Sequence, residues 1–214
     1  GLVVRSRDNL QPHKIPYAHD GEFLPDFLSA VAKIEPTILI GVSGQPKTFT
    51  REVVEAMGRI NDRPVIFALS NPTSKSECTA EEAYTWSNGR AIFASGSPFA
   101  PVTFGGKRFV PGQGNNAYVF PGVGLGAAVC GARAITEEMF AEAAKALARE
   151  VTAADLEPGC IYPPLKKIRQ VSAAIAAAVA EVAYRRDLAT RPRPGDLLAH
   201  VRSQQFEPAY RDYV

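Results

Sequence analysis

The chain has 214 residues, of which 46% are hydrophobic and 21% are charged, and its formal net charge is +2. A chain of this length and composition can bury a substantial core, so we expect a soluble protein of one globular unit or one and a half. The weak charge gives no reason to expect a nucleic-acid or anionic-membrane partner. The most continuous apolar stretch of the carboxyl half, Ala173–Ala180, is far below the length that spans a membrane.

The first predicted elements are a strand and a helix. Residues Gly1–Arg7 have the pattern of a strand and lead into a polar loop that contains prolines. Apolar residues then recur at helical spacing, and Pro36 ends this pattern. They predict one buried stripe, which comprises Leu24, Phe27, Leu28, Val31 and Ile34.

Three short apolar runs follow, and each ends in small, polar, turn-forming residues. The runs are Thr37–Ile40, Val65–Leu69 and Ala91–Ala94, and they lead into Gly41–Gln45, Ser70–Thr73 and Ser95–Pro98. A helical pattern follows each of the first two runs. Thr50 is placed to cap the first of these helices, and Thr79 and Glu82 form a capping box for the second. This succession is typical of parallel β-α-β units, whose carboxyl strand ends meet at one crevice.

The remaining sequence predicts a hairpin and a helical region. Gly105 and Gly106 form the turn of the hairpin, and small residues allow close packing of a helix over about Gly122–Ala132. Thr136 opens the next helix, and a long helix covers Leu165–Tyr184. The residues expected to face inward are Phe140, Ala143, Ala144 and Leu147 in the former, and Ile168, Val171, Ile175, Val179 and Val182 in the latter.

These elements predict an α/β fold with a parallel, Rossmann-like sheet, a carboxyl-terminal helical region and an extended tail. We expect a sheet domain over residues 1–135 and helices packed on it over residues 136–190. Prolines interrupt every regular pattern after that point. Residues 191–214 are therefore expected to form an extended arm, either packed on a neighbouring subunit or solvated.

The three cysteines, Cys78, Cys130 and Cys160, are widely separated and include no Cys-x-x-Cys pair. This pattern argues against a structural zinc site and favours reduced thiols in a reducing compartment. We expect all three to behave as small apolar side chains or surface thiols.

The residues at the strand ends supply backbone donors and amides rather than catalytic side chains. Gly41–Gly44 allows the main chain to approach a ligand closely, because glycine has no Cβ. Asn71, Asn115 and Asn116 carry carboxamides, which suit a nicotinamide amide or the carboxylate and hydroxyl of a substrate. Tight turns and helix caps would explain each of these residues singly. Their position at the same end of one sheet favours a ligand site.

Other polar residues give weaker signals. Lys14 follows the first predicted strand, where dinucleotide-binding folds contact the adenosine ribose, and a cation there would favour a 2′-phosphate. A solvated surface lysine is the alternative for both Lys14 and Lys47. The three histidines, His13, His19 and His200, are not spaced as the ligands of a metal site would be. A Ser-dependent hydrolase would need a base within hydrogen-bond reach of Ser70, Ser95 or Ser97, and no nucleophile elbow is present.

Six segments closely resemble the carboxyl-terminal part of malic enzymes. They are Ile40–Gly44, Phe67–Thr73, Glu77–Glu82, Ile92–Phe99, Pro111–Asn116 and Ile161–Pro164. The resemblance extends from Gly1 to Val214. Three further segments are most similar to the plant-type NADP-dependent branch, namely Tyr84–Ser87, Ala189–Arg191 and Pro208–Arg211.

The resemblance implies a metal-dependent oxidative decarboxylation of L-malate to pyruvate and carbon dioxide, in a homo-oligomer that is usually a tetramer. It assigns malate to Asn71, Asn115 and Asn116. It assigns the dinucleotide to Lys14, Val42, Ser43, Gly44, Leu69, Ser70, Asn71, Gly96 and Asn115. Because NADP-preferring members carry a lysine at the position of Lys14, we expect NADP, with NAD as the alternative. We expect a cytoplasmic protein, with an organellar form as the alternative.

Several parts of the family pattern precede the point that matches Gly1. They are the catalytic tyrosine and lysine, the carboxylates that bind Mg²⁺ or Mn²⁺, and the G-x-G-x-x-G turn, so no catalytic or metal-binding residue is expected here. The nearest match to that turn, Gly122–Ala127, lacks the third glycine and follows no nucleotide-binding strand. We expect a partial Rossmann-like sheet without its first nucleotide-binding half, in a fragment that is inactive without the missing amino-terminal part of the same enzyme. A non-catalytic nucleotide- or effector-binding module is the alternative.

Overall fold

The computed structural model describes residues 2–207 and 209. They fall into two units, the first unit Gly1–Gln113 and the second unit Gly114–Val214. This boundary precedes residue 135, where the sheet domain was expected to end, because Tyr118 and the helix after it are buried among the later helices. Among the described residues, no helix is both long and apolar enough to cross a membrane.

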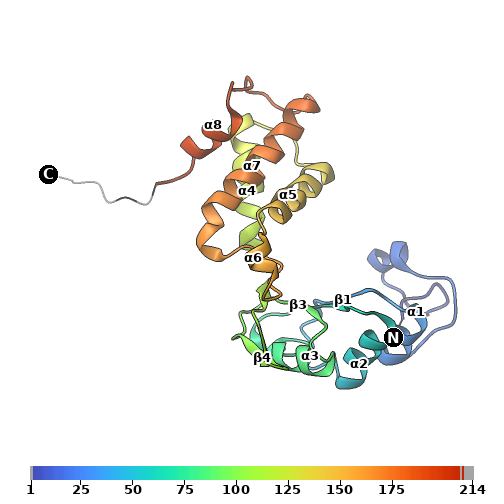
Figure 1. The fold of residues 1–214 in the computed structure, drawn as a ribbon. Coiled ribbons are helices and arrows are strands. Elements are labelled where there is room, and N and C mark those ends of the chain that lie inside the picture. Colours follow the sequence, from blue (N-terminus) through green and yellow to red (C-terminus); the bar gives the residue numbers. More distant parts are fainter. Residues whose placement is uncertain (1, 208, 210–214) are drawn as a thin grey trace. The chain divides into compact units, whose positions relative to one another are not determined.

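Four short strands form a parallel sheet in the first unit (Figure 1). They are β1 Ile38–Gly41, β2 Val65–Ala68, β3 Ile92–Ser95 and β6 Gly112–Gln113, in the order β1-β2-β3-β6. The three predicted strands are confirmed, and β6 is a fourth that the sequence did not predict. The register aligns the last residue of each strand with the next, and these residues are Gly41, Ala68, Ser95 and Gln113.

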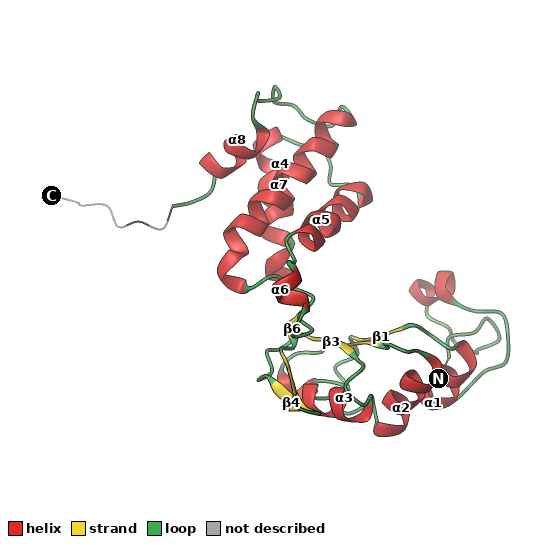
Figure 2. Ribbon diagram, viewed as in Figure 1, coloured by secondary structure: helices red, strands yellow, loops and turns green. Residues whose placement is uncertain are grey.

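Three helices lie along one face of this sheet (Figure 2). They are α1 Phe27–Ile34, α2 Arg51–Ile60 and α3 Ala80–Trp86. Burial alternates along the edge strand, since Leu39 is 6% exposed whereas Ile38 and Ile40 are 51% and 56% exposed. The fully buried side chains of the core include Val54, Met57, Ile66 and Phe93.

The amino-terminal segment differs from the prediction. In place of a strand over Gly1–Arg7, Val4 makes one isolated parallel bridge to His19, and a 3-10 helix, η1, covers Pro12–Tyr17. Of the predicted stripe on α1, only Val31 is buried. The reason is that α1 packs against α2 at the edge of the sheet, so most of its apolar face is not covered within this unit.

The predicted capping box and hairpin are present, whereas the predicted cap at Thr50 lacks its hydrogen bond. The capping box of α3 is confirmed, because the Glu82 N–H donates to Thr79 Oγ1 at 3.1 Å and the Thr79 N–H donates to Glu82 Oε2 at 2.8 Å. Thr50 stands at the N-cap of α2, but its side chain accepts no capping hydrogen bond. The hairpin is also confirmed, with β4 Val102–Phe104 antiparallel to β5 Lys107–Phe109. A further 3-10 helix, η2, covers Thr73–Lys75.

The second unit is helical in its described part. Its elements are η3 Asn116–Tyr118, α4 Phe120–Cys130, α5 Glu137–Arg149, α6 Ala153–Leu156, η4 Leu165–Lys167, α7 Ile168–Arg185 and α8 Leu197–Ser203. Helices α4 and α7 lie side by side (Figure 1). A Cβ on Gly126 of α4 would lie only 2.6 Å from the carbonyl oxygen of Ala176 of α7. This contact confirms that the small residues of α4 permit close packing.

Burial along α7 agrees with the predicted stripe, whereas burial along α5 agrees only in part. Phe140 of α5 is 42% exposed and Ala144 is also exposed, contrary to the prediction. Ala143 is buried as predicted and Leu147 is partly buried, whereas Met139 and Ala146 are buried although they were not predicted. The buried residues of the α7 stripe are Val171, Ile175, Val179 and Val182.

The segment predicted to be an extended arm contains a helix, so that prediction needs correction. Asp196 caps α8 by accepting the N–H of Ala199 at 2.9 Å, and Val201 of α8 is fully buried in the core of the second unit. The prolines of this segment are compatible with a helix because Pro192 and Pro194 precede it. Residues 208 and 210–214 lie outside the described part of the chain.

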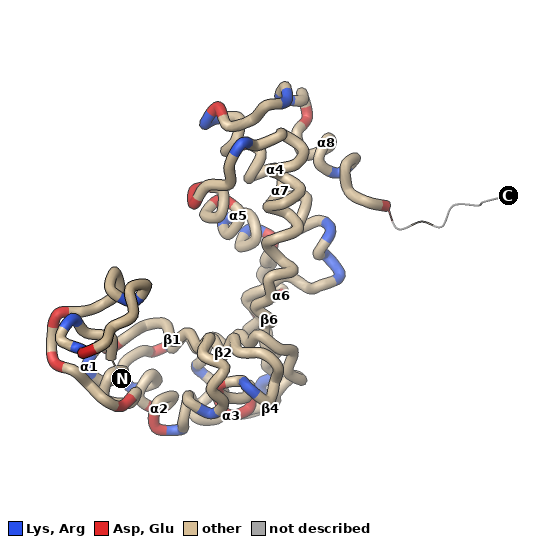
Figure 3. The backbone as a smooth tube through the Cα atoms, turned by 180° about the vertical axis from the view of Figure 1, so that it is seen from behind, with Lys and Arg blue, Asp and Glu red and all other residues tan. Residues whose placement is uncertain are grey.

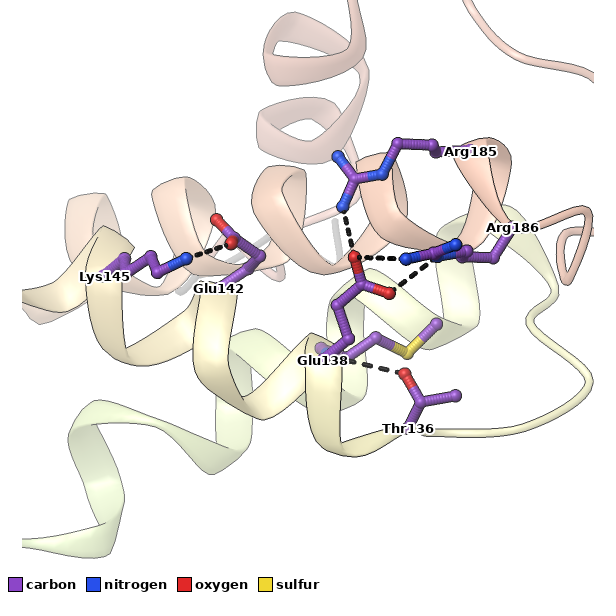
Figure 4. Close-up of polar contacts among 7 residues, drawn as sticks. Thr136, Glu138, Glu142, Lys145, Arg185 and Arg186 are labelled. Carbon is purple, nitrogen blue, oxygen red and sulfur yellow. Dashed lines mark hydrogen bonds and ion pairs between the residues drawn. The ribbon is translucent and has the colours of Figure 1, made fainter.

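Charged residues of both signs are spread along the backbone of the two units (Figure 3). One group joins α5 to α7, where Glu138 accepts hydrogen bonds from Arg186 at 2.7 Å and from Arg185 at 2.8 Å (Figure 4). These hydrogen bonds lower the pKa of the Glu138 carboxyl to about 2, and the bond from Arg186 has the largest effect.

Candidate functional site

The carboxyl ends of the parallel strands lie together at one edge of the sheet. Because the last residues of β1, β2 and β3 are in register, the turns that follow them start from neighbouring positions. Ligands of open α/β sheets bind outside this edge. The convergence that the sequence predicted is therefore confirmed for the three turns of this unit, which we call the β1, β2 and β3 turns.

The β1 turn exposes its backbone. Val42, Ser43 and Gly44 are all exposed. Gly44 has a φ of +68°, a conformation that favours glycine, and no atom lies within 4 Å of the place where its Cβ would be. The Gly44 N–H donates to Ser70 Oγ at 2.9 Å, so this donor is used within the protein and ties the β1 turn to the β2 turn.

The β2 turn combines Leu69, the buried Ser70 and the exposed Asn71. Asn71 Oδ1 accepts a hydrogen bond from Ser97 Oγ at 2.6 Å, and this bond ties the β2 turn to the β3 turn. With Oδ1 engaged, the Nδ2 group is the part of the carboxamide that is best placed to donate to a ligand. Its own contact with the carbonyl oxygen of Leu69 is long, at 3.4 Å.

Gly96 allows the β2 and β3 turns to touch. A Cβ at this position would lie 2.1 Å from the carbonyl oxygen of Leu69 and 2.9 Å from Asn71 Nδ2. The carbonyl oxygen of Gly96 also accepts a hydrogen bond from Gln113 Nε2 at 3.1 Å. The glycine is therefore required by the packing of the two turns, and it shapes the site by that contact.

The sequence analysis did not identify Glu77 as a residue of this region. Its side chain is fully buried beneath the β2 turn, where Oε1 accepts the Ser70 hydroxyl and Oε2 accepts the Ser70 N–H at 3.3 Å. From its residues alone, this segment predicted only the capping box of Thr79 and Glu82. The only signal was the place of Glu77 at the start of one of the six segments that resemble malic enzymes.

Asn115 and Asn116 belong to the second unit, and both are exposed. Asn115 caps η3, because its Oδ1 accepts the N–H of Ala117 at 2.8 Å. The capping role that was the alternative for Asn115 is thus present, and it uses the Oδ1 atom of the side chain. Asn116 is the first residue of η3.

Lys14 lies in η1 and is exposed. It lines a small cavity of about 220 Å³ together with Arg7, Asn9, Leu10 and Gln11. Two cationic and two amide side chains around one cavity form a suitable environment for an anionic group, because both kinds of side chain donate hydrogen bonds.

The serines and cysteines do not form a nucleophilic site. Ser70 is hydrogen-bonded to a carboxyl group, but it is buried and its oxygen already accepts the Gly44 N–H, whereas a nucleophile must reach its substrate. Ser95 Oγ donates to the carbonyl oxygen of Ser97 at 2.8 Å. Burial raises the pKa of the Cys78 thiol, which keeps it unreactive. This geometry gives the hydrolase hypothesis no support.

Comparison with known proteins places these features in a family. The family model "Malic enzyme, NAD binding domain" matches residues 1–184. The chloroplastic NADP-dependent malic enzyme of Zea mays is 57% identical over 215 residues, which cover 100% of this chain and 34% of that protein. The NADP-dependent malic enzyme of Vitis vinifera is also 57% identical, over 100% of this chain and 36% of that protein.

Two solved structures are also similar. The malic enzyme from Pyrococcus horikoshii Ot3 has a TM-score of 0.59 at 30% identity, over 77% of this chain and 34% of that chain. The malic enzyme of Entamoeba histolytica has a TM-score of 0.64 at 23% identity, over 88% of this chain and 34% of that chain, which supports the fold alone. This chain spans about a third of the length of the relatives it matches, and its parallel sheet is part of a Rossmann-like domain. The chain belongs to the malic enzyme family and corresponds to its NAD-binding domain.

Proposed function

We propose that this chain is the part of a malic enzyme that binds the nicotinamide end of a dinucleotide and L-malate. The longer protein would catalyse the oxidative decarboxylation of L-malate to pyruvate and carbon dioxide. The observation that carries this proposal is that the strand ends are in register and that hydrogen bonds connect the turns after them. The family to which the chain belongs gives these turns their expected ligands. Other segments of the longer protein, and further copies in a homo-oligomer, would complete the site.

Within this site we assign the dinucleotide to the exposed backbone of Val42–Gly44 and to Leu69–Asn71. The open space at Gly44 admits a ligand against the β1 turn. Asn71 Nδ2 would donate to an oxygen of the nicotinamide amide or of malate, because its Oδ1 is held by Ser97. Gly96 contributes by keeping the β2 and β3 turns in contact.

We assign malate to the carboxamides of Asn115 and Asn116, and we also assign Asn115 to the dinucleotide. The capping bond of Asn115 fixes its Oδ1 toward Ala117, so Nδ2 is the group that would donate to a substrate carboxylate or hydroxyl. Amide donors suit malate because they bind its oxygens without changing charge during the reaction.

We propose NADP as the cofactor, with Lys14 binding its 2′-phosphate. The exposed position of Lys14 at a cavity lined by donors supports this assignment. The relatives from Zea mays and Vitis vinifera carry NADP-dependent names. The Zea mays name also includes the word chloroplastic, whereas the cytoplasmic location of this protein stays a prediction from the sequence.

The chemical step needs groups from outside this chain. Removing hydride from a secondary alcohol requires a base for the hydroxyl proton, and decarboxylation requires a Lewis acid for the developing enolate. The described residues contain no group of three His, Cys, Asp or Glu side chains that could hold a metal ion. We therefore assign Mg²⁺ or Mn²⁺ to the remainder of the protein and expect the 214-residue chain alone to show no turnover.

The test uses the full-length protein, with malate-dependent formation of NADPH and NADH as the readout. We expect turnover with the wild type, and we expect Lys14→Ala to raise the KM for NADP about 10- to 100-fold, the value of a lost hydrogen bond to a charged group, with little effect on NAD. Lys33→Ala, which removes an exposed lysine from the last turn of α1, is the control. Equal losses for both cofactors would contradict the choice of NADP. Dinucleotide binding without turnover in the full-length wild type would favour the non-catalytic binding module.

A further inference from the structure

Glu77 is a buried acidic residue that the proposed catalytic function does not use. Its side chain is fully buried, and in the described part of the chain no ion pair includes it. Burying a carboxyl group costs free energy unless its hydrogen bonds compensate. Both of its oxygens accept hydrogen bonds from one residue, Ser70 of the β2 turn. The carboxyl group is therefore committed to fixing that turn.

Ser70 extends this constraint to the β1 turn. A hydroxyl has one proton and two lone pairs. The proton of Ser70 points to Glu77, so a lone pair faces the Gly44 N–H and accepts it at 2.9 Å. If the carboxyl group were absent, the hydroxyl would be free to rotate, and the Gly44 N–H would lose its fixed acceptor.

The backbone of Glu77 bonds to the segment that follows β1, and its side chain packs against the last residue of β1. The Phe49 N–H donates to the Glu77 carbonyl oxygen at 3.1 Å, and the Lys47 N–H donates to the Ser76 carbonyl oxygen at 3.2 Å. A Cβ on Gly41, the last residue of β1, would lie 2.5 Å from Glu77 Cδ. Glu77 therefore fills the space between the ends of β1 and β2 and is held there from both sides.

We propose that Glu77 is a positioning residue for the dinucleotide site. Its carboxyl group orients the Ser70 hydroxyl. Through this hydroxyl it fixes the β1 turn, at Gly44, relative to the β2 turn, and so holds both turns in position for the nicotinamide end of the cofactor. The inference rests on the proposed function for the identity of the ligand. Because Glu77 is fully buried, it acts through Ser70 and Gly44 and does not touch the cofactor.

The test compares full-length wild type with Glu77→Gln, Ser70→Ala and the double variant. Glutamine has the size of glutamate, but it replaces one carboxylate oxygen by an NH2 group, so one of the two Ser70 donors would face another donor instead of an acceptor. We expect each single variant to raise the dissociation constant and the KM for NADP about tenfold. The double variant should also lose about tenfold rather than about a hundredfold, because both substitutions break the same series of bonds. The KM for malate at saturating NADP should change little.

Glu82→Gln is the matched control. Glu82 lies in the same segment, but among the described residues its carboxylate accepts a hydrogen bond only from the N–H of Thr79, and glutamine can keep this capping bond, so the variant should not change the KM for NADP. Thermal unfolding of every variant separates loss of stability from loss of affinity, and Ser70→Ala keeps the test decisive if Glu77→Gln does not fold. Unchanged NADP affinity in folded variants, or additive losses in the double variant, would overturn the proposal. A wild type that binds no dinucleotide would overturn the proposed function as well.

Discussion

Replacing Gly126 by alanine tests how closely α4 packs on α7. The new Cβ would lie 2.6 Å from the Ala176 carbonyl oxygen, 3.0 Å from Ala176 Cα and 2.9 Å from Val179 Cβ. Two of these atoms belong to the backbone of α7, so the contact can be relieved only if the helices separate. Overpacking of this kind costs about 3 kcal/mol. The higher helix propensity of alanine offsets about 1 kcal/mol of that cost.

Gly124 provides a matched control in the same helix. No atom lies within 4 Å of the place where its Cβ would be, so Gly124→Ala gains the helix propensity without a clash. We expect this variant to be about 1 kcal/mol more stable than the wild type. Gly126→Ala should be about 2 kcal/mol less stable than the wild type, and the two variants should therefore differ by about 3 kcal/mol.

Urea unfolding of the 214-residue chain, followed by far-ultraviolet circular dichroism, measures these differences. Trp86, the only tryptophan, lies in the first unit and reports on that unit separately by its fluorescence. The midpoints of the two variants should differ by about 1 to 3 M urea for the slopes typical of small domains. Equal midpoints for Gly126→Ala and Gly124→Ala would refute the close contact between α4 and α7.

Two other substitutions test the strand ends and the ion-pair group of α5 and α7. Gly96→Ala would place a Cβ 2.1 Å from the Leu69 carbonyl oxygen, so we expect the first unit to lose about 3 kcal/mol by Trp86 fluorescence in urea; an unchanged midpoint would contradict the contact. The pKa of Glu138 falls from 4.5 to about 2 on folding, so its stabilising effect is complete above pH 4.5 and is lost as the pH falls toward about 2. Glu138→Gln should therefore unfold at lower urea than the wild type above pH 4.5, and the two midpoints should converge near pH 2. A difference that does not depend on pH would show that the carboxylate charge is not its cause.

Local signals explain which elements of the fold could be predicted. The strands β1, β2 and β3 are apolar runs bounded by turn residues, and the capping box of Thr79 and Glu82 lies within four residues of sequence. Strand β6 has two residues and depends on pairing with β3, so no local pattern indicates it. Periodicity on α1 shows which side chains share a face, but it does not show whether another element covers that face. Phe27 and Ile34 are accordingly exposed although their spacing predicted burial.

The residue types of the candidate site could be predicted from the sequence, but the hydrogen bonds and contacts between them could not. Glycine and serine after β1 and β3, and serine, asparagine and proline after β2, predicted the three turns, because these residues favour turns and lie at equivalent strand ends. The sequence gives no indication that the Gly44 N–H bonds to Ser70, or that Gly96 is required by the Leu69 carbonyl oxygen. Both facts depend on contacts between neighbouring turns. The burial of Glu77 was hidden for the same reason, since its partner is set by the fold of the sheet.

Serine suits the linkage of these turns because one hydroxyl can accept from one turn and donate to another. Ser70 accepts the Gly44 N–H and donates to Glu77, and Ser97 donates to Asn71 from the β3 turn. An apolar residue at either serine would leave a polar group of a neighbouring turn without its partner. Because these bonds form within the protein, the turns are ordered before any ligand arrives. A site ordered in advance loses less conformational freedom on binding, so the hydroxyls contribute to affinity without contacting the ligand.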